Sequence, residues 1–261
     1  MQLDVALLPD AAHISAGCVL IVVDQIRAST TVATVLDLEV RDLLLAGDVA
    51  TARDLARSTG SLLAGEHHAR KPAGFDFDNS PSELSRAGIG GHGLVLCTTN
   101  GTAVLSRLRS ADHVLVGCLR NARAVAEAAV DLATAAGMDG SVQVVCAGTL
   151  DLFALEDAVA AGVIIERAAE RLGATGRPVE LTDAARAALR LRGSYPDLLT
   201  AMTDSSGGAT LREIGRAEDI AFCAEVDVTG TVPYLVHGDL LRIASLEIGT
   251  DGSTSVAEAR F

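Results

Sequence analysis

Tryptophan is absent from this sequence, and aromatic residues make up only 3% of it. Because 49% of the residues are nevertheless apolar, the core must be built from Ala, Val, Leu and Ile. Such a core is typical of parallel strands covered by helices. The length of 261 residues suits one large α/β domain or two smaller ones.

Positive charge is also scarce. Lysine occurs once, as Lys71, and the formal net charge is −13 with a pI near 4.8. A strongly acidic surface repels nucleic acids and anionic membranes, and no Lys/Arg run overrides it. We therefore expect neither kind of partner, and arginine must supply any cation that a binding site needs.

Cysteine pairs are missing as well. Single cysteines stand at 18, 97, 118, 146 and 223, without a CxxC or a Cys–His metal-ligand spacing. This pattern argues against a zinc site and a disulfide framework, and indicates buried thiols in a reducing compartment. No leader pattern opens the sequence, and no apolar run is long enough to span a bilayer. We expect a soluble, cytoplasmic protein.

Short β-branched runs alternate with Ala-rich segments over the first 150 residues. The expected strands are 3–8, 18–24, 40–46, 62–65, 93–98, 113–117 and 141–147, and the expected helices are 30–39, 48–59, 81–87, 102–109, 121–136 and 154–172. This alternation predicts a three-layer α/β/α fold with a mainly parallel or mixed sheet. We assign 1–150 to an α/β body and 151–261 to a helix-rich segment that returns to the sheet; both together form either one domain or two.

Four of the expected strands end in small, hydroxyl-bearing or amide residues, in "VVDQIRAST", "CTTNGT", "VGCLRN" and "VCAGT". The carboxyl ends of parallel strands form the ligand crevice, and helix N-termini there suit a phosphate. Each junction alone is also explained as a helix N-cap. The candidate anion-binding residues are Ser29, Thr30, Asn79, Thr99, Asn100, Gly101, Thr102, Asn121, Cys146, Gly148 and Thr149.

Charged candidates accompany these donors. Asp24 ends a strand and Arg27 follows three residues later, so the acid could hold a divalent cation while the guanidinium forks onto phosphate oxygens. A simple Asp24–Arg27 ion pair is the alternative. Glu66 follows another short strand, and Glu156 is a third candidate metal ligand, although the helix dipole alone favours acids in that first turn.

Other polar residues have structural explanations. Ser80 with Glu83 three residues later forms a capping-box pattern, with Pro81 at the first helical position. The adjacent His67 and His68 do not have the spacing of a metal pair. Cys146 is either a nucleophile with a lowered pKa or, as we favour, a buried inert thiol. No DxD pair follows the strand that ends at Asp24, because Gln25 and Ile26 come next. P-loop and GxSxG motifs are absent, as is a GxGxxG after any strand.

Taken in order, these pieces resemble the 2-phosphosulfolactate phosphatase (ComB-like) family. The matching segments, which span residues 19–236, are "VVDQIRASTT", "GFDFDNSPSE", "CTTNGT", "VGCLRNA", "VCAGT…FALEDAVAAG", "LTDAARAAL" and "EDIAFCAEVD…VP". The resemblance implies Mg²⁺-dependent hydrolysis of 2-phosphosulfolactate to sulfolactate and phosphate, a step of coenzyme M biosynthesis, in a cytosolic α/β protein.

Two positions depart from the family pattern: His67 stands where an arginine is usual, and Asp151 where glycine is usual. We therefore hold two hypotheses. In the first, Asp24, Arg27 and Glu66 are catalytic, Mg²⁺ is bound by Asp24, Glu66 and Glu156, and the substrate is a small anionic phosphate ester. In the second, the chain is a weak or inactive anion-binding homologue, or acts on a different 2-phospho acid. A homodimer is an open alternative to a monomer.

Overall fold

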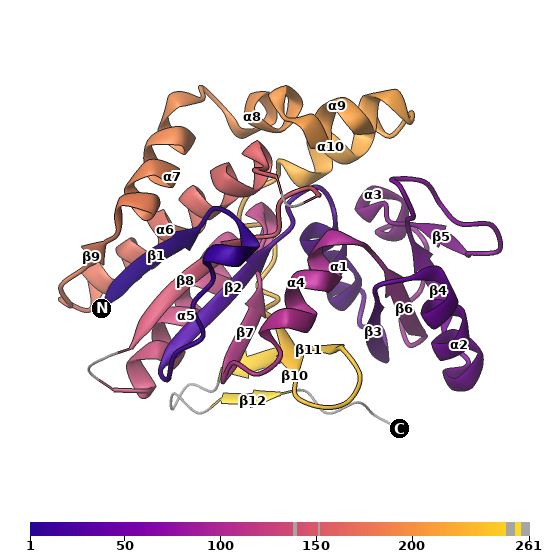
Figure 1. Cartoon of the computed structure of the whole chain (residues 1–261), viewed down its shortest axis with the longest axis horizontal. Helices are drawn as coiled ribbons and strands as arrows, with labels where there is room; N and C mark the ends of the chain where they lie inside the picture. Colours follow the sequence, from indigo (N-terminus) through magenta and orange to yellow (C-terminus); the bar gives the residue numbers. More distant parts are fainter. Residues whose placement is uncertain (138–139, 151, 249–253, 257–261) are drawn as a thin grey trace.

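The computed structural model of the chain describes residues 1–137, 140–150, 152–248 and 254–256 (Figure 1). Its strands are β1 (Gln2–Ala6), β2 (Cys18–Val23), β3 (Asp42–Ala46), β4 (Leu62–Gly65), β5 (Phe77–Asp78), β6 (Gly93–Cys97), β7 (His113–Val116), β8 (Ser141–Cys146), β9 (Glu180–Leu181), β10 (Pro233–Val236), β11 (Arg242–Ile248) and β12 (Thr254–Val256). Its α-helices are α1 (Ala28–Asp37), α2 (Val49–Thr59), α3 (Pro81–Leu84), α4 (Asn100–Leu108), α5 (Ala122–Ala135), α6 (Leu155–Ala174), α7 (Asp183–Ser194), α8 (Leu198–Asp204), α9 (Ser206–Glu213) and α10 (Ala217–Cys223). All the strands and helices expected from the alternation up to residue 174 are present.

Local signals fix several element ends. The Asp48 side chain accepts a hydrogen bond from the Thr51 amide at 2.9 Å and so caps α2, which ends at Gly60 in the left-handed region, with φ of 67°. Ser80 caps α3 as predicted, because its Oγ accepts from the Glu83 amide at 3.3 Å. The Glu83 carboxylate pairs instead with Arg216, 2.9 Å away.

The sheet consists of two parallel groups joined by an antiparallel hairpin. Its order is β5-β4-β6-β3-β11-β10-β7-β2-β8-β1-β9, with β12 paired to β11. Strands β5, β4, β6 and β3 are mutually parallel, as are β7, β2, β8, β1 and β9, whereas β10 and β11 run antiparallel to their neighbours. The predicted mixed sheet is confirmed, but the polar strand ends belong to two groups instead of one continuous edge.

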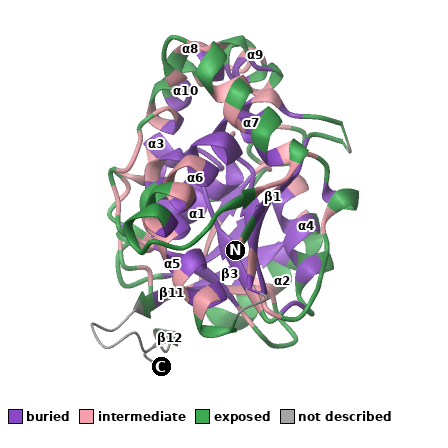
Figure 2. Cartoon of the chain, turned by 90° about the vertical axis from the view of Figure 1, so that its left-hand side faces the viewer, coloured by how far each residue is buried: buried purple, intermediate pink, exposed green. Residues whose placement is uncertain are grey.

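Alternation along β2 shows why helices cover both faces of the sheet. Val19, Ile21 and Val23 pack with α5 and α6, whereas Leu20 and Val22 pack with α1 and α4. Successive side chains of a strand point to opposite faces, so a fully apolar strand needs cover on both. Figure 2 shows buried strands, with exposed residues gathered on outer helices such as α2 and α9. The three-layer α/β/α fold is confirmed.

After α6 the chain forms the helices α7 to α10, drawn in orange in Figure 1, and then returns to the sheet through β10 and β11. The division at residue 150 stays a prediction. Within the described residues, no helix combines the length and the apolar character needed to cross a membrane.

Candidate active site

A cavity of about 310 Å³ lies where the polar ends of β2, β4, β6 and β8 face helix α9. Its wall combines both parallel groups of the sheet with the helix-rich segment. The residues that line it are Asp24, Ile26, Arg27, Glu66, His67, His68, Ala69, Asn79, Thr98, Thr99, Asn100, Thr149, Leu150, Ser206, Gly207, Thr210 and Leu211.

Asp24 follows β2 and is only 8% exposed. One carboxylate oxygen, Oδ2, accepts from the Gly101 amide at 2.9 Å, and Oδ1 accepts from the Ala28 amide at 3.3 Å. Gly101 follows β6, so this carboxylate connects the two parallel groups of the sheet. A Cβ at Gly101 would lie 3.0 Å from Oδ2, which explains why glycine stands there.

Burial raises the pKa of Asp24 to about 6. The neighbouring carboxylates of Glu66 and Glu156 act in the same direction, while the amides of Ala28 and Gly101 oppose them by stabilising the ionised form. Asp24 therefore titrates close to neutral pH, as is common for acids in catalytic sites.

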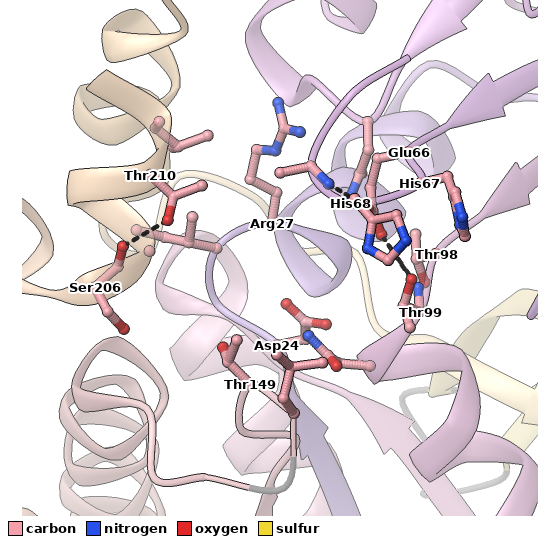
Figure 3. A pocket seen from close by; sticks show the side chains of 17 residues that line it. Asp24, Arg27, Glu66, His67, His68, Thr98, Thr99, Thr149, Ser206 and Thr210 are labelled. Atoms are coloured by element: carbon pink, nitrogen blue, oxygen red, sulfur yellow. Dashed lines mark hydrogen bonds between the residues drawn. The ribbon is translucent and has the colours of Figure 1, made fainter. Parts of the chain in front are cut away.

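Glu66 follows β4 on another part of the wall. Its Oε1 accepts from both the amide and the hydroxyl of Thr99 at 3.2 Å, and its Oε2 accepts from the Ala69 amide at 2.7 Å. Figure 3 shows Glu66 above Thr99, with the His68 ring beside it. Glu66 is thus held by the chain from two sides while it borders the same cavity as Asp24.

Arg27 is held by two carboxylates other than Asp24. Its Nη1 lies 2.9 Å from Oδ2 of Asp219, and its Nη2 lies 3.5 Å from Oδ1 of Asp78. The alternative of an Asp24–Arg27 ion pair is therefore wrong. In Figure 3 the Arg27 side chain stands between Thr210 and His68.

Asn79 has a side-chain oxygen that no group of the protein donates to. The residue is 3% exposed, borders the cavity, and its Oδ1 is buried without a hydrogen-bond partner. A buried amide oxygen without a partner is costly, so a bound ligand that donates to it would be favoured.

Seven of the predicted site residues meet at the cavity: Asp24, Arg27, Glu66, Asn79, Thr99, Asn100 and Thr149. Gly101 stands just behind the wall and contributes its amide to Asp24. Three predicted anion ligands turn into the protein instead. The Ser29 hydroxyl accepts from the Asp24 amide at 2.8 Å, that of Thr30 donates to the Gln25 carbonyl at 2.9 Å, and that of Thr102 lies 2.8 Å from the Thr98 hydroxyl.

Asn121, Cys146 and Gly148 also lie behind the wall. The Asn121 side chain accepts from the Cys118 amide at 2.9 Å and donates to the Val116 carbonyl at 3.2 Å, so it caps a turn. Cys146 has no exposed surface, and burial raises its pKa well above its ordinary value, which favours the interpretation as an inert thiol over that as a nucleophile. Gly148 donates its amide to Asp157 at 2.9 Å.

Glu156, the predicted third metal ligand, is not on the wall. It is 2% exposed and faces the first turn of α9, where a Cβ at Gly207 would lie 2.2 Å from its Oε1. Throughout the part of the chain that the structure describes, no three His, Cys, Asp or Glu side chains gather as a metal-binding group. The prediction that Glu156 is a third metal ligand beside Asp24 and Glu66 is therefore wrong.

We expect Gly207→Ala to displace α9 from the cavity. The added Cβ would meet Glu156 Oε1 at 2.2 Å and the Ile26 Cβ at 3.2 Å, and overpacking of this kind costs about 1–3 kcal/mol. Urea unfolding measures the loss. Gly173→Ala in α6 is the matched control, because nothing lies within 4 Å of its added Cβ and alanine favours helix. Equal stability of the two variants would contradict this packing.

Three wall residues from α9 were not expected from the sequence: Ser206, Gly207 and Thr210. Their segment "TDSSGGAT" has the same hydroxyl and glycine character as the strand ends. It follows a helix, however, and a search confined to strand ends passes over it. Of the two positions that depart from the family pattern, His67 borders the cavity and Asp151 lies outside the described residues.

Comparison with known proteins identifies the family of the chain. The family model for 2-phosphosulpholactate phosphatase matches residues 5–238. A probable 2-phosphosulfolactate phosphatase of Thermus thermophilus is 38% identical over 236 residues, covering 90% of this chain and 94% of that protein. A protein of the same name from Deinococcus radiodurans is 37% identical, covering 92% of this chain and 95% of that protein. Another from Symbiobacterium thermophilum is 34% identical, covering 87% of this chain and 95% of that protein. The chain belongs to the 2-phosphosulfolactate phosphatase family.

Proposed function

We propose that the chain is a Mg²⁺-dependent phosphatase that hydrolyses 2-phosphosulfolactate to sulfolactate and phosphate. One observation carries the proposal: two carboxylates, a guanidinium and a ring of hydroxyl and amide groups border one cavity in a member of this family. A phosphate monoester needs such a site, because its negative charge repels a nucleophile and its leaving oxygen must be stabilised.

The charges of the site favour a divalent cation. Arg27 is the one arginine or lysine on the described wall, and it is already paired with Asp219 and Asp78. With Asp24 and Glu66 ionised, a dianionic phosphate would meet net negative charge. Mg²⁺ in phosphoryl-transfer sites is commonly held by one or two carboxylates plus the substrate phosphate. Asp24 and Glu66 fit that arrangement and would hold the ion, which would neutralise phosphate charge and lower the pKa of bound water.

The protein's own residues would bind and orient the substrate. Arg27 would contribute N–H donors to its anionic groups, and the Thr149 hydroxyl would donate to its oxygens. The Thr99 hydroxyl, in contrast, already donates to Glu66. The Asn79 side-chain oxygen Oδ1, which lacks a partner in the protein, would accept from a bound water. Because the cavity is lined from both groups of the sheet and from α9, the substrate would be enclosed on several sides.

Phosphate release tests the proposal directly. We expect release from 2-phosphosulfolactate with Mg²⁺, and its loss when the ion is chelated and its return when the ion is restored. Other 2-phospho acids, offered at the same concentration, show whether this substrate is preferred. Tight binding of these anions without release from any of them would favour the alternative of an anion-binding homologue.

The pH dependence provides a second test. With the pKa of Asp24 near 6, kcat/KM should fall as the pH drops through about 6, because the protonated carboxyl no longer binds a cation. More Mg²⁺ should move this fall to lower pH, since the ion competes with the proton. The measurement is kcat/KM from about pH 5 to about pH 8 at two Mg²⁺ concentrations. The titration of the substrate's own phosphate must first be subtracted. If the pH at which kcat/KM falls is then the same at both Mg²⁺ concentrations, this role of Asp24 is contradicted.

We also propose that the protein acts in the cytoplasm, in coenzyme M biosynthesis. All five cysteines are free and buried, which suits a reducing compartment.

A further inference from the structure

The guanidinium of Arg27 is held from two distant parts of the chain. Asp219 belongs to α10 and Asp78 to β5, and the side chains of all three residues are at most 4% exposed. A buried guanidinium requires counter-charge, so this pairing explains how Arg27 tolerates its position. Asp219 makes the closer contact, at 2.9 Å against 3.5 Å for Asp78.

Asp219 is itself fixed by other donors. Its Oδ1 accepts from the hydroxyls of Ser80 and Ser82 at 2.8 and 2.5 Å and from the Ser82 amide at 3.2 Å. These contacts hold one oxygen at the start of α3 and leave Oδ2 for Arg27. The carboxylate is fully buried and cannot swing away to follow a moving guanidinium.

We propose that Asp219 is a positioning residue for Arg27: it holds the guanidinium in the one orientation that meets the substrate. The proposal rests on the proposed function in that Arg27 binds the phosphorylated substrate. An arginine side chain has several rotatable bonds, and a free one would lose that freedom on binding each substrate molecule. Asp219, anchored by Ser80 and Ser82, removes that cost in advance, as supporting residues do in preorganised sites.

A purely structural role for Asp219, linking α10 to α3, makes a different prediction, and a double-mutant cycle separates the two. Asp219→Asn should lower kcat/KM about 10- to 100-fold in the wild-type background, as loss of a supporting contact does elsewhere. In an Arg27→Ala background the same change should cost less than about 2-fold, because there is no guanidinium left to position. Equal losses in both backgrounds would overturn the proposal.

Two further variants control the cycle. Ser82→Ala removes one donor from Oδ1 of Asp219 and keeps the carboxylate. It should therefore give a smaller loss of kcat/KM, which again disappears in the Arg27→Ala background. If Asp219→Asn fails to fold, Ser82→Ala takes its place in the cycle. Asp131→Asn breaks an ion pair with Arg171, 3.0 Å apart and away from the cavity, and should leave kcat/KM within about 2-fold. A loss with Asp131→Asn as large as that with Asp219→Asn would overturn the positioning role.

The same double-mutant cycle can be measured without turnover, as the affinity for inorganic phosphate determined by calorimetry. Asp219→Asn should weaken phosphate binding about 10-fold or more when Arg27 is present and leave it unchanged when Arg27 is absent. If the wild type releases no phosphate from any ester, the proposed function fails, while this binding cycle still decides the role of Asp219. Weakening by the same factor in both backgrounds would refute that role.

Discussion

Asp24→Asn should lower the rate of phosphate release by about 10²- to 10⁴-fold, the range typical when a catalytic acid–base or electrostatic group is removed. The substitution keeps the size of the side chain and removes the negative charge that would hold the cation. The measurement is kcat at saturating substrate and Mg²⁺. Turnover close to that of the wild type would falsify any part for Asp24 in the mechanism.

The same substitution should leave the fold intact. Burial disfavours the ionised form of Asp24 and raises its pKa to about 6, so above that pH the native state carries the cost of the charge. A neutral side-chain amide avoids this cost. It keeps one oxygen acceptor, so only one of the two hydrogen bonds from the backbone amides of Ala28 and Gly101 is lost. The matched control is Asp4→Asn in β1: its carboxylate, away from the cavity, accepts from the side chains of Gln143 and Thr182. Normal turnover in this control would show that loss of a strand carboxylate does not by itself stop the reaction.

The strands and helices up to residue 174 could be predicted from short stretches of sequence, because each stretch contains its own apolar pattern or capping residue. The apolar run of β2 requires cover on both faces, and the caps at Asp48 and Ser80 can be recognised from a few residues. The order of the strands is not local information. Strands β10 and β11, near the end of the chain, insert between β3 and β7, and no feature of their sequence specifies those neighbours.

The site was predictable where a polar residue directly follows a strand, as Asp24 and Glu66 do, or lies within a few residues of its end, as Thr149 does. The sequence could not show which hydroxyls turn inward. Thr30 lies in the first turn of α1, where a nearby backbone carbonyl accepts from its hydroxyl, whereas Thr99 borders the cavity. Residue type is the same in both cases, so residue type alone does not predict which of the two lines the cavity.

Acids that act through distant partners were the hardest to place. Asp219 and Asp157 both lie in the first turn of a helix, where the helix dipole is a sufficient explanation for an acid. Their partners are 192 and 132 residues away along the chain, at Arg27 and Gln25. Only the folded structure shows that these acids hold the cavity wall from behind.

Asp157→Ala should therefore cause a large loss of stability. One carboxylate oxygen accepts from the Gln25 amide at 2.8 Å and the other from the Gly148 amide at 2.9 Å, and the residue is 2% exposed. Alanine would leave two buried amides without partners, which at about 1–3 kcal/mol each amounts to about 2–6 kcal/mol. That is a large part of the roughly 5–15 kcal/mol by which a domain is typically stable. Burial and the carboxylates of Asp24 and Glu156 raise the pKa of Asp157 well above its ordinary range, so removal of the acid relieves a cost that offsets part of this loss. Urea unfolding measures the difference.

The loss should extend to activity, because Gln25 follows Asp24 and Gly148 precedes Thr149, so the two anchored amides adjoin two residues of the cavity wall. Glu166→Ala on the same helix is the control. The Glu166 side chain is 39% exposed and its ion-pair distances are 3.7 and 4.0 Å, so its removal should change stability by less than about 1 kcal/mol. If Asp157→Ala unfolds at the same urea concentration as Glu166→Ala, the two amides find other partners. The two strand ends would then be held in place by their own strands, without the help of α6.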